Sequence, residues 1–198
     1  MQKFIRHFGF KSLAVCGVFA FLSCASRTAV GLDSFQVYYS DSKAVPLVNP
    51  QKNTETIEEN QHISAVYGDK KFSSDAWMRL DDSTVHMMVF SSMGNVIAEI
   101  VCTGDSLSMH SKWMDVKKVK PEYVVADIQF CYYPTEVLKE NFHSSGFSFE
   151  EAHDGEKLTR TLSENGNLIL KMEKNGKQLV LENFLRRYSY RIMAEGDL

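Results

Sequence analysis

Short runs in which apolar and polar residues alternate recur from residue 62 onward, and this period of two is typical of β-strands. Five such runs come before residue 111, at 62–67, 72–80, 85–90, 96–102 and 107–110. Turn-forming pairs separate them, for example Gly68-Asp69 and Gly104-Asp105. The pattern predicts an antiparallel meander. Before it, residues 35–40 and 44–48 are expected to be extended, and residues 49–60 to form a loop or at most a short helix.

Four further strands are predicted near the C-terminus, at 158–162, 168–173, 178–181 and 188–193. Asn165-Gly166 and Asn175-Gly176 lie at the first two junctions. Asn-Gly is the preferred pair for a type I′ hairpin because both central residues need a positive φ. One face of these strands is predicted to be apolar, and it consists of Leu158, Leu162, Leu168, Leu170, Met172, Leu179, Leu181, Tyr188, Tyr190 and Ile192.

A longer apolar segment, residues 121–142, interrupts the strands and has two interpretations. As a helix it begins at Pro121, which suits a first turn, and it places Val124, Val125, Ile128, Cys131 and Tyr132 on one stripe. Pro134 ends or kinks this helix, because proline lacks an N–H and clashes with the turn before it. Residues 135–142 then form a second, shorter helix. As a strand, residues 124–132 alternate and are rich in β-branched and aromatic side chains. The two-helix interpretation is favoured.

A sheet of eight to ten strands with one apolar face has to be covered, and the segment 121–142 is the candidate cover. We therefore predict an α+β fold that is mainly β, namely an antiparallel, half-open β-barrel with a two-helix lid. The barrel and its lid form one domain, residues 35–198. The mouth of such a barrel is a place where apolar ligands bind.

The first residues resemble an export signal. A basic start with Lys3, Arg6 and Lys11 precedes an apolar run from residue 12 to 22, which predicts a signal peptide over residues 1–23. Cys24 then lies where a bacterial lipobox places its lipidated cysteine, and residues 24–34 would be a lipidated N-terminus and tether. Cleavage after Ala25 is the alternative, because Ser23-Cys24-Ala25 is also a small-x-small site.

Charge excludes one class of partner. Residues 1–24 contain three of the 22 Lys and Arg and none of the 25 Asp and Glu, so the rest of the chain has a net charge of −6. This argues against nucleic acid or anionic lipid headgroups as electrostatic partners.

Candidate chemistry is sparse. Once residues 1–24 are set aside, two of the four cysteines remain, Cys102 and Cys131. They could pair in an oxidising compartment, or they could be two buried small apolar residues. The histidines do not cluster with metal-ligand spacing, and no nucleophile elbow, P-loop or dinucleotide-binding glycine motif occurs. We therefore expect no enzyme activity, no metal and no cofactor.

Three stretches resemble a known family: residues 87–99, the run Asp127-x-Gln129-x-x-x-x-Pro134, and Arg160-Thr161-Leu162. They are similar to an uncharacterised bacterial outer-membrane lipoprotein family, a domain of unknown function often encoded with fatty-acid and aryl-polyene biosynthesis genes. That family is distantly similar to the LolA/LolB lipoprotein carrier and receptor. The resemblance implies an open barrel with a helical lid, a periplasmic site and an apolar acyl-binding cavity. The aromatic and β-branched filling of residues 121–142 departs from the family.

The expected function is that of an envelope lipoprotein, not an enzyme, that binds an acyl chain, a lipid or a lipidated client in its barrel. It would be a monomer anchored in the outer membrane, facing the periplasm and assisting lipid or lipoprotein transfer; a soluble periplasmic protein is the alternative location. The expected ligand-lining residues are Met87, Val89, Leu107, Met109, Ile128, Leu168, Leu170, Met172, Leu179 and Leu181. The alternative function is a structural or interaction lipoprotein whose barrel is filled by its own side chains.

Overall fold

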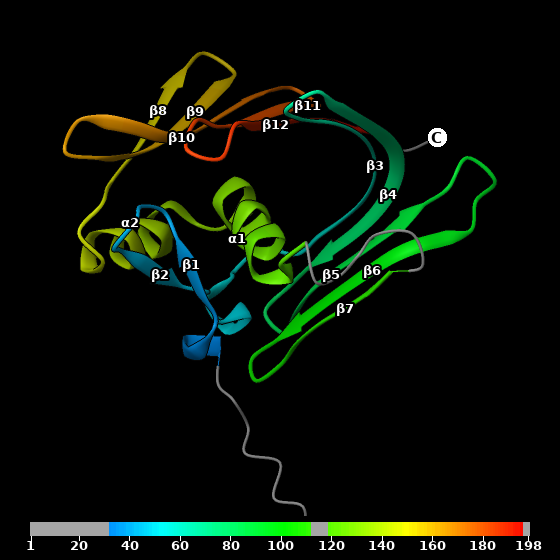
Figure 1. Ribbon diagram of the computed structural model, residues 1–198, viewed down its shortest axis with the longest axis horizontal. Helices are drawn as coiled ribbons and strands as arrows, with labels where there is room; N and C mark the ends of the chain where they lie inside the picture. The colour runs from blue at the N-terminus through cyan, green and yellow to red at the C-terminus, as the bar shows by residue number, and fades with distance from the viewer. Residues whose placement is uncertain (1–31, 112–118, 196–198) are drawn as a thin grey trace, which may run out of the picture.

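The computed structural model describes residues 32–111 and 119–195 (Figure 1). The predicted signal peptide, Cys24 and most of the tether lie outside these residues. In the described part, ten strands form one antiparallel sheet in the order β7-β6-β5-β4-β3-β12-β11-β10-β9-β8. Their bounds are β3 (Ile57–Tyr67), β4 (Lys70–Leu80), β5 (Thr84–Phe90), β6 (Val96–Thr103), β7 (Leu107–Ser111), β8 (Ser148–Asp154), β9 (Lys157–Glu164), β10 (Asn167–Asn175), β11 (Gln178–Asn183) and β12 (Tyr188–Ala194). The sheet does not close into a barrel, because β7 and β8 are its two edges.

Two helices form where the insert was predicted, so the helical interpretation is confirmed. They are α1 (Pro121–Tyr132) and α2 (Thr135–Ser144). Pro121 is in the first turn of α1, where its missing N–H costs no helical hydrogen bond. The helix ends when Tyr133 turns to extended backbone, and Pro134 is the N-cap of α2.

Helix α1 lies inside the curve of the sheet, surrounded on several sides by strands (Figure 1). Its residues from Val125 to Cys131 are all buried. A helix that is mostly apolar on every side is typical of a position in the core. This position explains why the composition of α1 also resembles that of a buried strand. The largest fully buried side chains of the core include Phe130 of α1 itself and, from the sheet, Met78, Leu80, Leu162, Leu170 and Met172.

The N-terminal part of the described chain packs on the helices. Strands β1 (Gln36–Tyr38) and β2 (Ala44–Pro46) form a separate hairpin beside α1 and α2 (Figure 1). Tyr39, which follows β1, contacts Phe142 of α2 edge to face, with ring centroids 5.5 Å apart. Two short 3₁₀ segments, Leu32–Ser34 and Pro50–Lys52, flank this hairpin. The helices are therefore held between a small hairpin and a large sheet.

Two expectations about strand positions are wrong. Strand β3 begins at Ile57, inside the stretch expected to be a loop, because Glu58 to Asn60 pair with β4 despite their polar side chains. Strand β8 was not expected at all. Its sequence contains one deeply buried apolar residue, Phe149, and its other side chains are mostly exposed, so period-two alternation is too weak to reveal an edge strand.

The two Asn-Gly pairs behave differently. Asn165 and Gly166 both have positive φ, 51° and 78°, as a type I′ turn requires. At the second junction Asn175 pairs with Gln178, so the turn residues are Gly176 and Lys177, one position later than predicted. There only Gly176 has a positive φ.

Candidate functional site

The space beneath the helices is filled with side chains. Most of the expected ligand-lining residues are buried in the core: Met87, Val89, Ile128, Leu170, Met172, Leu179 and Leu181. A cavity of about 10 Å³ lies between α1, α2 and the β1–β2 hairpin, lined by residues such as Val37, Ala126 and Leu138. This is about the volume that a single water needs. A cavity of this volume is too small for an acyl chain.

The remaining expected residues are less deeply placed. Leu107 and Met109, on edge strand β7, are half-buried and pack against the core. Leu168 is 41% exposed, while its neighbour Ile169 is buried. The reason is an irregularity in the pairing of β9 with β10 between Leu168 and Leu170, which shifts the side-chain alternation at the start of β10. The expectation that Leu168 shares a face with Leu170 is therefore wrong.

A larger hollow, of about 380 Å³, opens where β10 turns into β11. It lies at the C-terminal end of α1, because Tyr132 forms part of its wall. The lining residues are Glu58, Glu59, Tyr132, Lys174, Gly176, Lys177, Leu179, Ile192, Ala194 and Glu195. Leu179 is the single expected ligand-lining residue that lines this hollow. We call this hollow the mouth pocket.

The mouth pocket combines an apolar floor with a charged rim. Leu179, Ile192 and the ring of Tyr132 supply the apolar surface, and the rim carries glutamates from β3 and lysines from the β10–β11 hairpin. The hydroxyl of Tyr132 accepts a hydrogen bond of 2.9 Å from Nε2 of Gln61 and contacts Oε1 of Glu59 at 3.3 Å. Burial raises the pKa of Tyr132 far above its usual value, so its hydroxyl stays neutral.

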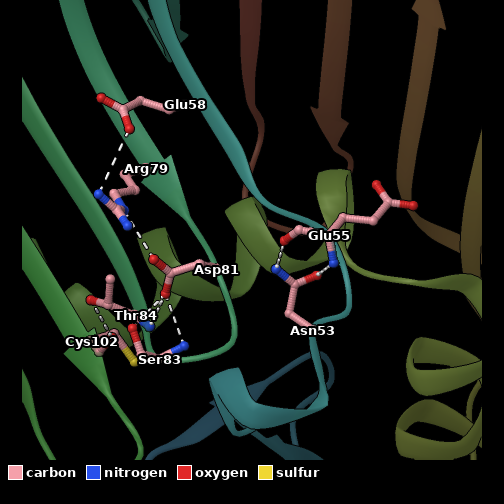
Figure 2. A network of polar contacts seen from close by, with 8 residues as sticks. All are labelled: Asn53, Glu55, Glu58, Arg79, Asp81, Ser83, Thr84 and Cys102. Carbon is pink, nitrogen blue, oxygen red and sulfur yellow. Dashed lines mark hydrogen bonds and ion pairs between the residues drawn. The ribbon is translucent and has the colours of Figure 1, made fainter.

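The rim is tied to the neighbouring β4–β5 turn through Arg79. Its Nη1 lies 3.8 Å from the Glu58 carboxylate and its Nε donates a 2.9 Å hydrogen bond to Asp81, as Figure 2 shows. Asp81 also accepts hydrogen bonds from the backbone N–H and hydroxyl of Ser83 and from the N–H of Thr84. The hydrogen bond from the Ser83 hydroxyl is the main reason why the pKa of Asp81 falls to about 2. The side chain of Asp81 therefore connects Arg79, Ser83 and Thr84 in the turn below the rim.

Asp127, the first residue of the motif on α1, faces strand β12. Its Oδ2 accepts a hydrogen bond of 2.7 Å from the hydroxyl of Tyr188. The carboxyl group is buried, and burial raises its pKa to about 7, although the Tyr188 hydrogen bond and the charge of Arg186 act in the opposite direction. The Tyr188 hydroxyl also accepts a hydrogen bond of 3.0 Å from the side chain of Asn183. This arrangement fastens the middle of α1 to the sheet.

Gln129, the second motif residue, holds the N-terminal segment. Its side-chain amide donates to the carbonyl oxygen of Val48 at 2.7 Å and accepts from the N–H of Val48 at 3.0 Å. Both groups are buried, so the Gln129 amide replaces a β-strand partner for Val48. Gln129 therefore fixes the chain at Val48 against α1.

Arg160 on β9 joins both helices to the sheet. Its Nη1 donates to the carbonyl oxygen of Phe130 at 2.9 Å, which satisfies one of the carbonyls that a helix leaves unpaired at its C-terminus. Its Nε donates to Glu151 on β8 at 2.7 Å, and the same carboxylate accepts a 2.6 Å hydrogen bond from the Thr135 hydroxyl at the start of α2. The turn between α1 and α2 is therefore clamped.

The remaining cysteines and the possible metal ligands can also be placed. Cys102 and Cys131 are both buried and free, and burial raises the pKa of the Cys102 thiol to about 12. Across residues 32–111 and 119–195, no three His, Cys, Asp or Glu side chains gather as metal ligands would. Neither described helix has the length and apolarity needed to cross a membrane.

Sequence reasoning missed the rim of the mouth pocket. Its charged residues come from three segments that are distant in the sequence. A polar residue at the end of a strand does not by itself indicate a binding site. One signal existed, because Lys174 continues the alternation of Leu170 and Met172 on the inward face of β10. Glu59 likewise continues the face of Gln61 and Ile63.

A protein-family model matches most of the described chain. The family model described as "Protein of unknown function (DUF3261)" matches residues 58–194, which covers both helices and nearly all of the ten-stranded sheet. No curated protein matches the chain.

Proposed function

Since the chain belongs to the DUF3261 family, whose function is unknown, we propose a function from its own geometry. It is a non-enzymatic envelope lipoprotein that binds the end of an acyl chain, carried by a lipid or a lipidated client, in the mouth pocket. By this binding it assists transfer of lipid or lipoprotein at the outer membrane.

The observation that carries this proposal is the mouth pocket itself. Its volume of about 380 Å³ is within the usual range for small-molecule sites, about 300–1,000 Å³. The floor of Tyr132, Leu179 and Ile192 is apolar, as a hydrocarbon tail requires, and the charged rim suits a polar headgroup that stays in water.

Deeper insertion of a tail requires movement of α1. The pocket borders Tyr132 at the end of α1, and the apolar inner face of the sheet continues from Leu179 to Leu181 and Met172 beneath the helix. If α1 moves outward, that surface becomes an extension of the pocket. We also propose that the protein functions in a similar way to the LolA/LolB carrier and receptor. The curved sheet with its helical cover supports this part of the proposal.

Ala194 offers a direct test. Its side chain lines the pocket, whereas that of the adjacent Met193 is exposed on the opposite face of β12. Ala194→Trp is expected to weaken binding of a fluorescent fatty acid by about tenfold, equivalent to about 1.4 kcal/mol, because the indole occupies the hollow. Met193→Trp is the matched control and should bind as the unmodified protein does. Equal affinities for both folded variants would overturn the pocket assignment.

Anchoring is tested separately at Cys24. Cys24→Ala should leave the protein either unprocessed or soluble in the periplasm, because the residue that would carry the acyl chains is gone. Cell fractionation of the two forms measures this. Normal retention of the processed variant in the outer-membrane fraction after an alkaline wash that removes peripheral proteins would refute lipidation.

A second function is favoured by the filled interior. The side chains of Leu170, Met172 and Leu181 beneath the helices are almost completely buried, which suits a structural or interaction lipoprotein whose barrel holds no ligand. Mass spectrometry of lipids extracted from protein purified without detergent separates the two functions. An acyl species in stoichiometric amount supports the carrier, and its absence supports the structural protein.

A further inference from the structure

Exposed apolar side chains gather at the end of the sheet opposite the mouth pocket. The pocket lies at the β10–β11 turn, whereas the far end of β11 leads into the β11–β12 turn. Phe184 and Leu185 form the start of this turn and are 46% and 47% exposed. The N–H of Phe184 donates to the carbonyl oxygen of Ile169, which brings the exposed Leu168 beside the turn.

Two tyrosines extend this apolar surface. Tyr67, at the end of β3, is opposite Tyr188 in the strand pairing, and the two rings stack with centroids 6.4 Å apart. Tyr38 is joined to the turn because Nη2 of Arg186 donates to its carbonyl oxygen at 2.6 Å. We call Tyr38, Tyr67, Leu168, Phe184 and Leu185 the turn rim. All five are at least 41% exposed.

The turn that carries Phe184 and Leu185 has a defined conformation. The side chain of Asn183 accepts a hydrogen bond of 2.8 Å from the N–H of Arg186. The guanidinium of Arg186 lies 4.1 Å from the ring centre of Tyr123 on α1, a cation–π contact. The apolar pair is therefore presented on a fixed support, which lowers the entropy cost of binding.

Basic side chains surround the turn rim although the whole chain is acidic, with a net charge of −3. Arg187, two positions after Leu185, is exposed. Lys70 and Lys71, also exposed, begin β4 beside Tyr67, where Asp69 is the acidic neighbour in the turn. Apolar and aromatic tips beside Lys and Arg are typical of proteins that lie on anionic lipid surfaces.

We propose that the turn rim docks on the surface of a bilayer containing anionic phospholipids. Phe184 and Leu185 insert at the level of the headgroups, and the basic side chains face the lipid phosphates. This contact is separate from an N-terminal lipid anchor and from the mouth pocket, so it does not depend on the acyl-binding proposal. It would also correct the conclusion, drawn from net charge, that anionic headgroups are not partners.

Depth-dependent fluorescence quenching tests the proposal. Phe184→Trp and the control Met193→Trp are each made in the full chain and reconstituted with vesicles of phosphatidylethanolamine and phosphatidylglycerol whose acyl chains are brominated. After subtraction of the signal of the native tryptophans, quenching at position 184 is expected to be several-fold greater than at position 193. An anchor alone would tether both positions alike. Leu185→Trp is a second reporter in case Phe184→Trp fails to fold.

Equal quenching at positions 184 and 193 overturns the proposal, and it is also the result expected if the turn rim binds a protein. The charge component has its own test. Lys70→Glu combined with Lys71→Glu, or vesicles without phosphatidylglycerol, should reduce quenching at position 184. Unchanged quenching in both experiments would refute the requirement for anionic lipid.

Discussion

The hydroxyl of Tyr188 donates a hydrogen bond of 2.7 Å to the carboxyl group of Asp127, and this contact joins the buried face of α1 to strand β12. Tyr188 is also held by Asn183 in the strand next to it. The position of the helix over the sheet therefore depends on a polar contact in an apolar environment, where the protonation of Asp127 affects stability.

The raised pKa of Asp127 predicts that the protein loses stability as the pH rises. The carboxyl has a pKa of about 7 in the folded protein and of about 3.9 in an unfolded chain. Between these values the folded state binds more protons, so the free energy of unfolding falls with increasing pH. Below about pH 4 no stability is lost through this group. The loss in the free energy of unfolding grows at higher pH, stops increasing above about pH 7, and reaches at most about 4 kcal/mol. Urea unfolding at pH 5 and pH 8 measures it.

Asp127→Asn is the control for this prediction. The asparagine oxygen still accepts from Tyr188, but the side chain does not ionise. The stability difference between variant and unmodified protein should therefore shift in favour of the variant between pH 5 and pH 8. If the stability difference between the two proteins does not change with pH, Asp127 has the same protonation in the folded and unfolded states, and the prediction is wrong.

Arg160→Met is expected to destabilise the protein strongly. The substitution leaves the half-buried Glu151 carboxylate without its guanidinium partner and the carbonyl of Phe130 without a donor. Removing one partner of a buried ion pair costs about 3–5 kcal/mol. Chemical denaturation measures the loss. Lys157→Met removes a more exposed ion pair, with Glu173, and should change stability by less than about 1 kcal/mol. Similar losses for both variants would contradict the assigned role of Arg160.

Gln129→Leu should loosen the N-terminal segment. Leucine has nearly the same size, but it leaves the N–H and carbonyl of Val48 unpaired in a buried place. Each unsatisfied group costs about 1–3 kcal/mol. Limited proteolysis should then cleave the region around residues 40–50 earlier than in the unmodified protein. Asn141→Leu is a milder comparison, because it removes a single hydrogen bond, to the carbonyl of Pro46.

Leu168→Asp and Leu170→Asp test the irregularity in β10. Leu170 is fully buried, so a charged side chain there should prevent folding or cost several kcal/mol. Leu168 is exposed, and its replacement should change stability by about 0.5 kcal/mol or less. Circular dichroism and thermal unfolding of the two proteins give the comparison. A large loss of stability in Leu168→Asp would show that Leu168 is buried and that the regular alternation predicted from the sequence is correct.

Particular elements show how far the sequence pattern could be used. Asn165-Gly166 predicts its turn correctly because the positive φ is a local requirement of the backbone. Strand β8 could not be predicted, because an edge strand with mostly solvent-facing side chains needs no apolar alternation. The segment around Val125 fits both a helix and a strand in composition, although the helix was favoured. Its burial explains this ambiguity, because a buried helix needs few polar residues.

The candidate site was predictable only in part. Leu179 carries an apolar signal, but Glu59 and Lys174 join it only because separate strands end side by side. The net charge likewise gives no indication that Lys70, Lys71 and Arg187 gather at one end of the sheet.

By itself, the sequence determined the local features of this protein: the period-two strands, the break at Pro134 and the helical start at Pro121, since each depends on neighbouring residues. Only the tertiary structure decided how deeply α1 is buried, where the strand pairing slips at Leu168, and where a hollow remains. Those properties depend on the packing of side chains from distant segments, and the volume that such side chains fill or leave empty is not encoded in any local pattern.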